Sequence, residues 1–196
     1  SSVRVYDPSL PLSGAELSTL PASPAFVQVH AIAVDDSGNI YVADAAASRI
    51  AVYDSSYVQQ ADFSIEASAG TPISPALRRP EALAAVGGVL YVGDRPSDST
   101  YGDTVRIMKV NLADGLLLEV FGEPVLGTNY SSIAGPSVYG FQEGQLSMAA
   151  GIQVDAGGLL YVADPAQFAI QVFDENGAYL YYLYDSSNLM RTVTSV

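Results

Sequence analysis

The sequence predicts an all-β fold made of repeated antiparallel sheets, and three observations lead to this prediction. A strand-turn-strand pattern occurs three times, at residues 31–44, 82–94 and 151–164. Each copy is followed by a segment in which apolar residues alternate with variable ones, as they do in a half-buried strand. The chain of 196 residues is 49% hydrophobic and 15% charged, a composition that is typical of a folded globular domain rather than a disordered chain.

The first two strands of each repeat form a hairpin with a recognisable end. An apolar-rich strand leads into a tight turn that contains glycine, and the second strand closes on Tyr-Val, a small residue and an aspartate. A short glycine-containing turn between two such strands is typical of a β-hairpin. The closing aspartates are Asp44, Asp94 and Asp164.

Two further strands complete each repeat as a four-stranded sheet. Third strands are predicted at 49–54, 106–111 and 169–174, and fourth strands at 57–65, 116–121 and 179–184. A four-stranded antiparallel sheet that repeats along a chain is the blade of a β-propeller. Residues 3–7 align with 50–54, so we expect a partial blade at the N-terminal end of the sequence.

These motifs resemble the NHL repeat family of β-propellers, whose units end a hairpin in Tyr-Val-Ala-Asp and continue with Arg-Ile and an aromatic-Asp stop. The first repeat carries Asp44 and Arg49, and the second carries Asp94 and Arg106 on either side of an insertion at 97–102. The third keeps Asp164 but has Ala169 where the family places arginine. The resemblance implies a propeller, in which we expect these aspartates and arginines to be structural.

The repeats predict one propeller domain over residues 1–196. Its parts are a partial blade at 1–25, full blades at 26–70, 80–124 and 144–186, and a tail strand at 187–196. Either residues 190–196 add a strand to the partial blade and close a four-bladed ring, or the chain forms an open arc. An open arc exposes blade edges and faces, which association with another chain would cover. A third interpretation is that the sequence is a piece of a larger propeller.

Composition argues against several partners and chemistries. Eight Lys and Arg residues stand against 21 Asp and Glu, so a net charge of −13 disfavours nucleic acid, whose binding needs a cationic face. No segment approaches the roughly 20 apolar residues of a membrane span, so membrane insertion is not expected. The absence of cysteine removes thiolate metal sites and cysteine nucleophiles.

No catalytic residue and no cofactor is predicted. His30 is the single histidine, which prevents a three-histidine zinc site in one chain, and no Gly-x-Ser-x-Gly elbow is present. The run Asp35-Asp36-Ser37-Gly38-Asn39 lacks the spacing and terminal glutamate of an EF-hand, so a hairpin turn is expected there rather than a calcium loop. Lyases and lactonases exist among NHL-like propellers, but their ligand sets do not map onto this chain. The alternative function is a hydrolase or lyase with calcium in an acidic channel completed by a second chain.

The predicted function is a non-catalytic extracellular interaction or assembly module that self-associates into a ring or filament through its blade edges. A surface built mainly from Ser, Thr, Gly, Gln and Tyr favours an extracellular or cell-surface location, with the periplasm as the alternative. The expected partners are copies of the chain or another extracellular protein, and glycan is a further candidate ligand.

Tyrosines and the long segment 122–143 supply the predicted contact regions. Alternation places Tyr179 and Tyr181 on one face of the last strand and Tyr182 and Tyr184 on the other. Asn129 begins an Asn-Tyr-Ser sequon and is the candidate glycosylation site. The candidate interaction residues are Tyr130, Tyr139, Tyr179, Tyr181, Tyr182 and Tyr184.

Overall fold

A computed structural model describes residues 1–9, 16–67, 76–95, 105–122 and 144–184. These residues form antiparallel sheets and one short 3-10 turn at Ala45–Ala47, which confirms the predicted all-β class. No helix within the described part of the chain has the length and apolar character to cross a membrane. The predicted tail strand at 187–196 lies outside the described residues.

The strands group into four sheets in chain order. The partial blade contains β1 (Arg4–Tyr6) and β2 (Glu16–Thr19). The first blade contains β3 (Val29–Val34), β4 (Ile40–Asp44) and β5 (Arg49–Tyr53). The second blade contains β6 (Pro80–Val86), β7 (Val89–Asp94), β8 (Arg106–Asn111) and β9 (Leu117–Phe121). The third blade contains β10 (Gly151–Val154), β11 (Leu160–Asp164), β12 (Ala169–Phe173) and β13 (Tyr179–Tyr184).

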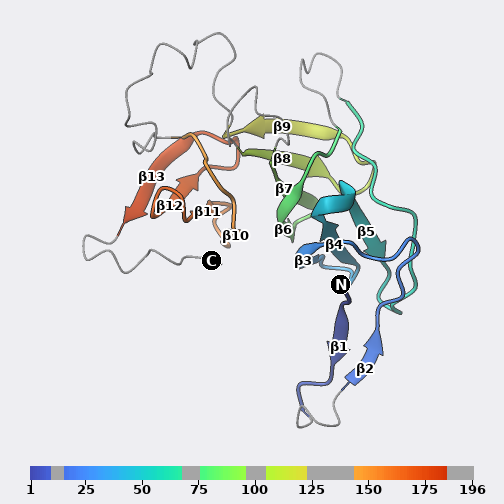
Figure 1. Cartoon of the computed structure of the whole chain (residues 1–196). Helices are drawn as coiled ribbons and strands as arrows, with labels where there is room; N and C mark the ends of the chain where they lie inside the picture. The colour runs from blue at the N-terminus through green and yellow to red at the C-terminus, as the bar shows by residue number, and fades with distance from the viewer. Residues whose placement is uncertain (10–15, 68–75, 96–104, 123–143, 185–196) are drawn as a thin grey trace.

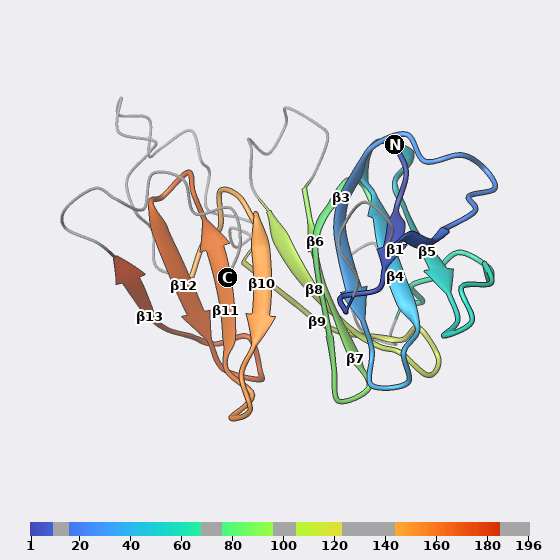
Figure 2. The same ribbon diagram turned by 90° about the horizontal axis from the view of Figure 1, so that it is seen from below.

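The sheets are arranged as an arc (Figure 1), with the partial blade at one end and β13 toward the other. Their first strands lie side by side on the inner side of this arc, because β6 contacts both β3 and β10. Figure 2 shows the same order from below, with β3, β6 and β10 at the centre of the molecule. Over the described residues the fold is therefore an open partial propeller.

The first blade differs from its predicted four-strand form. Residues 57–65 were expected to be its fourth strand, but they form only an isolated bridge between Tyr53 and Gln59. The backbone N–H groups of Gln60 and Phe63 donate to Val52 and Ile50 at 2.8 and 2.9 Å. These donors are three residues apart, whereas an antiparallel ladder repeats every two residues. The segment follows β5 without extending a regular ladder.

Blades pack face to face with repeated chemistry. In the first interface, Tyr41, Ala43 and Ile50 of the first blade pack on Leu90, Val92 and Met108 of the second. In the next interface, the equivalent Tyr91 and Ile107 pack on Leu160, Val162 and Phe173 of the third blade. In both interfaces the face that carries the tyrosine, Tyr41 or Tyr91, packs on the opposite, largely aliphatic face of the blade that follows.

Close approach of two blades restricts one position in this interface. Gly93 occupies the place that alanine has in Tyr-Val-Ala-Asp of the other blades, and its backbone conformation is ordinary for a strand. A Cβ atom there would lie 2.9 Å from the Cβ of Ala149 and 3.1 Å from that of Ala82. The small residue therefore sets the spacing between β7 and the segment that leads into β10.

We expect Gly93→Ala to lower the free energy of unfolding by roughly 1–3 kcal/mol, because an extra methyl group overfills a packed interface. Without this contact, alanine would be favoured over glycine in a strand. Urea denaturation of Gly93→Ala, Ala149→Gly and the double variant measures the effect. The double variant should lose less free energy of unfolding than the sum of the losses in the two single variants. A loss equal to that sum would contradict the proposed clash.

Candidate functional site

The aspartate that ends the second strand anchors the first two full blades. In the second blade, Asp94 accepts hydrogen bonds from the backbone N–H groups of Arg78 and Arg79 at 2.9 and 2.8 Å. Its other oxygen accepts from Arg106 Nε and Nη2 at 3.0 and 2.8 Å, and neither side chain is exposed. The carboxylate thus joins the lead-in segment, β7 and β8 in one charge-assisted network.

The first blade repeats this arrangement with a looser ion pair. Asp44 accepts from the backbone N–H of Gln28 at 2.7 Å and from that of Val27 at 3.1 Å. Arg49 Nη2 lies 3.4 Å from Asp44 and 2.6 Å from the carbonyl oxygen of Pro24. Its Nη1 reaches a second carboxylate, Asp62, at 3.3 Å.

The third blade holds its aspartate without a cation among the described residues. Asp164 pairs in register with Ala169, and Gln167 donates its side-chain N–H to Asp164 at 2.9 Å. The backbone N–H groups of Ser147 and Met148 also donate to Asp164, at 2.8 and 3.2 Å. Burial raises the pKa of Asp164, and these hydrogen bonds offset only part of that shift. An amide has therefore replaced the arginine, at the cost of an uncompensated buried charge.

Other aspartates close the hairpin turns. The carboxylate of Asp35 accepts from the backbone N–H groups of Ser37 and Asn39, from the Asn39 side chain and from the Tyr41 hydroxyl, at 2.9 to 3.0 Å. Asp155 repeats the pattern with Gly157, Leu159 and the Tyr161 hydroxyl. These contacts are those of a turn whose aspartate caps its own backbone. Within the described part of the chain, no three acidic or histidine side chains gather as metal ligands would.

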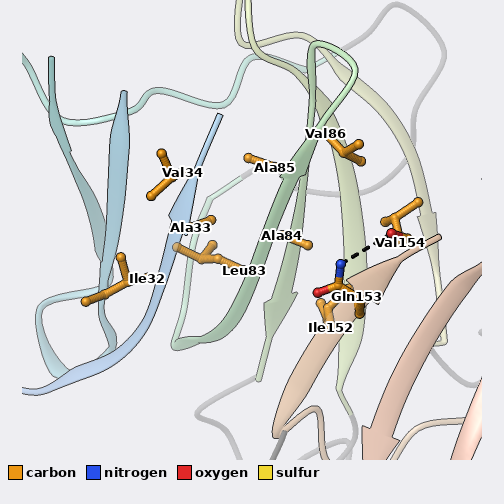
Figure 3. A pocket seen from close by; sticks show the side chains of 10 residues that line it. All are labelled: Ile32, Ala33, Val34, Leu83, Ala84, Ala85, Val86, Ile152, Gln153 and Val154. Atoms are coloured by element: carbon orange, nitrogen blue, oxygen red, sulfur yellow. Dashed lines mark hydrogen bonds between the residues drawn. The ribbon is translucent and has the colours of Figure 1, made fainter. Parts of the chain in front are cut away.

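The inner strands line a groove of about 300 Å³ (Figure 3), with Ile32 and Val34 from β3 on one side and Val154 from β10 on the other. Ile32 is 48% exposed and Val34 54% exposed, whereas the equivalent Leu83 and Ile152 are each 6% exposed. The difference arises because, in the described part of the chain, the partial blade has two strands and packs on Val42 and Tyr53 but not on Ile32 or Val34. Sequence analysis missed these two residues, since strand alternation does not show which neighbour is absent.

The tyrosines of β13 do not all share the predicted faces. A register shift between Val172 and Phe173 places Tyr179 opposite Phe173, and the two rings pack 6.0 Å apart. Tyr179 therefore belongs to the core between the second and third blades, while Tyr181 is 43% exposed on the other face. The prediction that Tyr179 and Tyr181 share a face is wrong. The register shift inserts one extra residue between them relative to β12, so their side chains point to opposite faces of the sheet.

The remaining candidates are placed as follows. Tyr182 is exposed on β13, and Tyr184 pairs with Ala169 in the strand register. His30 is exposed on β3. Tyr130, Tyr139 and Asn129 lie outside the described residues.

Comparison with known proteins agrees with this architecture. Residues 26–53, which include the Asp44–Arg49 pair, match the family model of the NHL repeat. The comparison with curated proteins gives no significant match. The chain contains an NHL repeat, which confirms the resemblance expected from its motifs.

Solved structures of β-propeller-like proteins are similar in fold to the chain. Hydrazine synthase of Kuenenia stuttgartiensis is 16% identical, with a TM-score of 0.50 over 85% of this chain and 40% of that one. A protein of unknown function from Bacteroides caccae is 13% identical, with a TM-score of 0.50 over 87% of this chain and 50% of that one. U3-55K is 16% identical, with a TM-score of 0.53 over 85% of this chain and 41% of that one. The chain spans half or less of each structure's length, and at these identities the likeness shows the fold alone.

We expect Arg106→Met to lower the free energy of unfolding by about 3–5 kcal/mol, because it leaves the carboxylate of Asp94 buried without its cation. Arg4→Met is the matched control, since the Arg4–Glu16 pair is exposed and should contribute little to stability. Chemical denaturation of both variants measures the difference. Equal losses in the two variants would contradict an anchoring role for the buried pair.

The two kinds of aspartate should titrate with opposite effects on stability. The pKa of Asp164 is higher in the folded state than its ordinary value of 3.8. The contribution of Asp164 to the free energy of unfolding is therefore complete below pH 3.8 and is lost as the pH rises through the pKa of the folded state. The Leu159 backbone N–H, with the Tyr161 hydroxyl and the Gly157 N–H, lowers the pKa of Asp155, so its contribution is lost as pH falls below 3.8.

We therefore expect the stability difference between wild type and Asp164→Asn to shrink as pH rises from about 4 to about 7. The difference for Asp155→Asn should instead shrink as pH falls below about 4. Urea denaturation across this pH range measures both slopes, and subtraction of each variant from wild type cancels the other titrating groups. Slopes of the same sign would contradict these assignments.

Proposed function

We propose that the chain is a non-catalytic extracellular interaction module that associates with copies of itself. The NHL repeat and the β-propeller fold support a protein-interaction module. The observation that carries the finer proposal is the uncovered apolar surface of Ile32 and Val34 on β3. Contiguous apolar surface of this kind is normally covered in a soluble protein.

The packing inside the chain supports a second copy as the occupant. Twice in this chain, a face that carries a tyrosine at the Tyr41 or Tyr91 position covers the face equivalent to that of Ile32. The third blade has one more such face, with Tyr161 in the equivalent place and Tyr181 and Leu183 partly exposed beside it. The third blade of one copy would contact β3 of the next, and such a head-to-tail contact builds a ring or a filament.

Charge sets the conditions for this association. Each chain carries a net charge of −13, so two copies repel each other at low ionic strength. Salt screens this repulsion and leaves the apolar contact in place. Association should therefore strengthen with added salt, which distinguishes it from association driven by ion pairs.

The test compares native and denatured mass of one preparation. We expect sedimentation velocity to give multiples of the chain mass, with a larger associated fraction at higher salt. Ile32→Glu should shift the protein to the monomer, because it places a charge in the apolar contact. Val58→Glu is the matched control, since Val58 is also exposed, at 55%, and follows β5, outside both β3 and the third blade.

Two results would count against the proposal. A wild-type chain that remains a monomer at all concentrations and salt levels would contradict self-association. Stoichiometric calcium binding after chelation and reloading would contradict the assignment as a non-catalytic module without a cofactor, and would favour the calcium-dependent hydrolase or lyase.

A further inference from the structure

The outer strand of the third blade forms an edge of the molecule. β13 is the last strand of its sheet, and β12 is the only described strand with which it pairs. Both ribbon views place β13 at the outer end of the arc (Figure 1, Figure 2). The last strand of a sheet presents a row of backbone N–H and C=O groups to which a strand of another chain can pair.

The chain itself covers part of the corresponding edges of the other two blades. Along β5, the backbone N–H groups of Gln60 and Phe63 donate to strand carbonyl oxygens. At β9, the backbone N–H of Leu117 donates to the carbonyl oxygen of Glu66 at 2.9 Å. The N–H of Glu66 donates in turn to the carbonyl oxygen of Gly115 at 2.8 Å. The segment that leaves the first blade therefore contacts both of these edges.

Charge protects β9 as well, but not β13. One extra residue interrupts the register of each strand, Leu118 in β9 and Leu180 in β13, so the two strands align residue by residue. Glu119 of β9 then corresponds to Tyr181 of β13. A charged side chain on an edge strand opposes pairing with a second copy, whereas the six residues of β13 carry no charge. In a chain of net charge −13, two copies of β13 can therefore meet without like charges in the paired strands.

The sequence of β13 fits an antiparallel copy of itself. Residues 180–183 read Leu-Tyr-Tyr-Leu, which is the same in both directions. Antiparallel pairing about a two-fold axis between Tyr181 and Tyr182 places leucine opposite leucine and tyrosine opposite tyrosine. All four side chains are 40–45% exposed, so each presents surface to a neighbouring strand. Aromatic and apolar pairs directly opposite each other stabilise such a sheet.

We propose that β13 pairs with β13 of a second copy of the chain and joins two third blades into one continuous sheet. Leu180 of each copy lies opposite Leu183 of the other, and Tyr181 lies opposite Tyr182. This contact uses the edge of the third blade, whereas the head-to-tail contact uses the face that covers β3. A pairing of two short strands is weak by itself. It rests on the proposed self-association, because head-to-tail assemblies bring many such edges together side by side.

Engineered cysteines report the register of this pairing, since the chain contains no cysteine. Full-length chains that carry Leu180→Cys or Leu183→Cys are mixed in a glutathione redox buffer. Opposed residues of an antiparallel pair have Cα atoms about 4.5 or 5.5 Å apart, which a disulfide spans. Identical positions of the two copies lie about 10 Å apart along the strands, which a disulfide does not span. We expect the mixture to give about tenfold more linked dimer than either variant alone.

Leu118→Cys provides the matched control. Leu118 is the equivalent residue of β9 and is 44% exposed, close to the 45% of Leu180. Mixed with Leu183→Cys, it should give only the yield of random collision. Equal yields in the two mixtures would overturn the proposal. Absence of the disulfide between Leu180→Cys and Leu183→Cys chains whose circular dichroism matches wild type would also overturn it, because another segment of the chain would then occupy the edge.

A second background separates this contact from the head-to-tail contact. Chains with Ile32→Glu should sediment as monomers, but a disulfide traps even a transient pair, so the same cysteine mixture should still form linked dimers more slowly. Complete loss of the disulfide in this background would show that the cysteines meet only through the head-to-tail contact, and would overturn the edge pairing. Disulfide formation in both backgrounds, with a wild type that sediments only as a monomer, would support the edge pairing and contradict the head-to-tail contact alone.

Discussion

The buried aspartate at the end of the second strand is the interaction on which each full blade depends. Asp94 receives two backbone N–H groups from the segment before its blade and two guanidinium donors from the strand after it. A carboxylate with four donors is stable without water, whereas the same group with any one partner removed carries a large desolvation penalty. The lead-in segment, the hairpin and the third strand are therefore fixed together.

The three full blades solve this requirement in different ways, and the differences have consequences. The first blade shares its arginine with a second carboxylate, Asp62, and one buried N–H of Arg49 has no hydrogen-bond partner among the described residues. The third blade uses the amide of Gln167, which satisfies the hydrogen bonds of Asp164 but not its charge. Variation of one structural pair thus gives a looser ion pair in one blade and a pH-sensitive group in another.

Propeller geometry also explains why the ends of the arc differ from its middle. The first blade covers one face of the second, and the second covers one face of the third. Leu83 and Ile152, which occupy the position of Ile32 in these two covered blades, are therefore almost fully buried. The partial blade covers Val42 and Tyr53 but does not reach Ile32 and Val34. Apolar residues that serve the core in the middle of the arc become an interaction surface at its end.

The sequence by itself determined the all-β class, the three hairpins, the partial N-terminal blade and the aspartates that end the second strands, because turn chemistry and strand alternation act over a few residues. Only the tertiary structure decided the contacts that join segments far apart in the chain. The register shift that buries Tyr179, the replacement of arginine by Gln167 and the approach of Asp62 to Arg49 depend on which strands become neighbours. The exposure of Ile32 likewise depends on a neighbouring sheet, since the local pattern of β3 is the same as that of a buried strand.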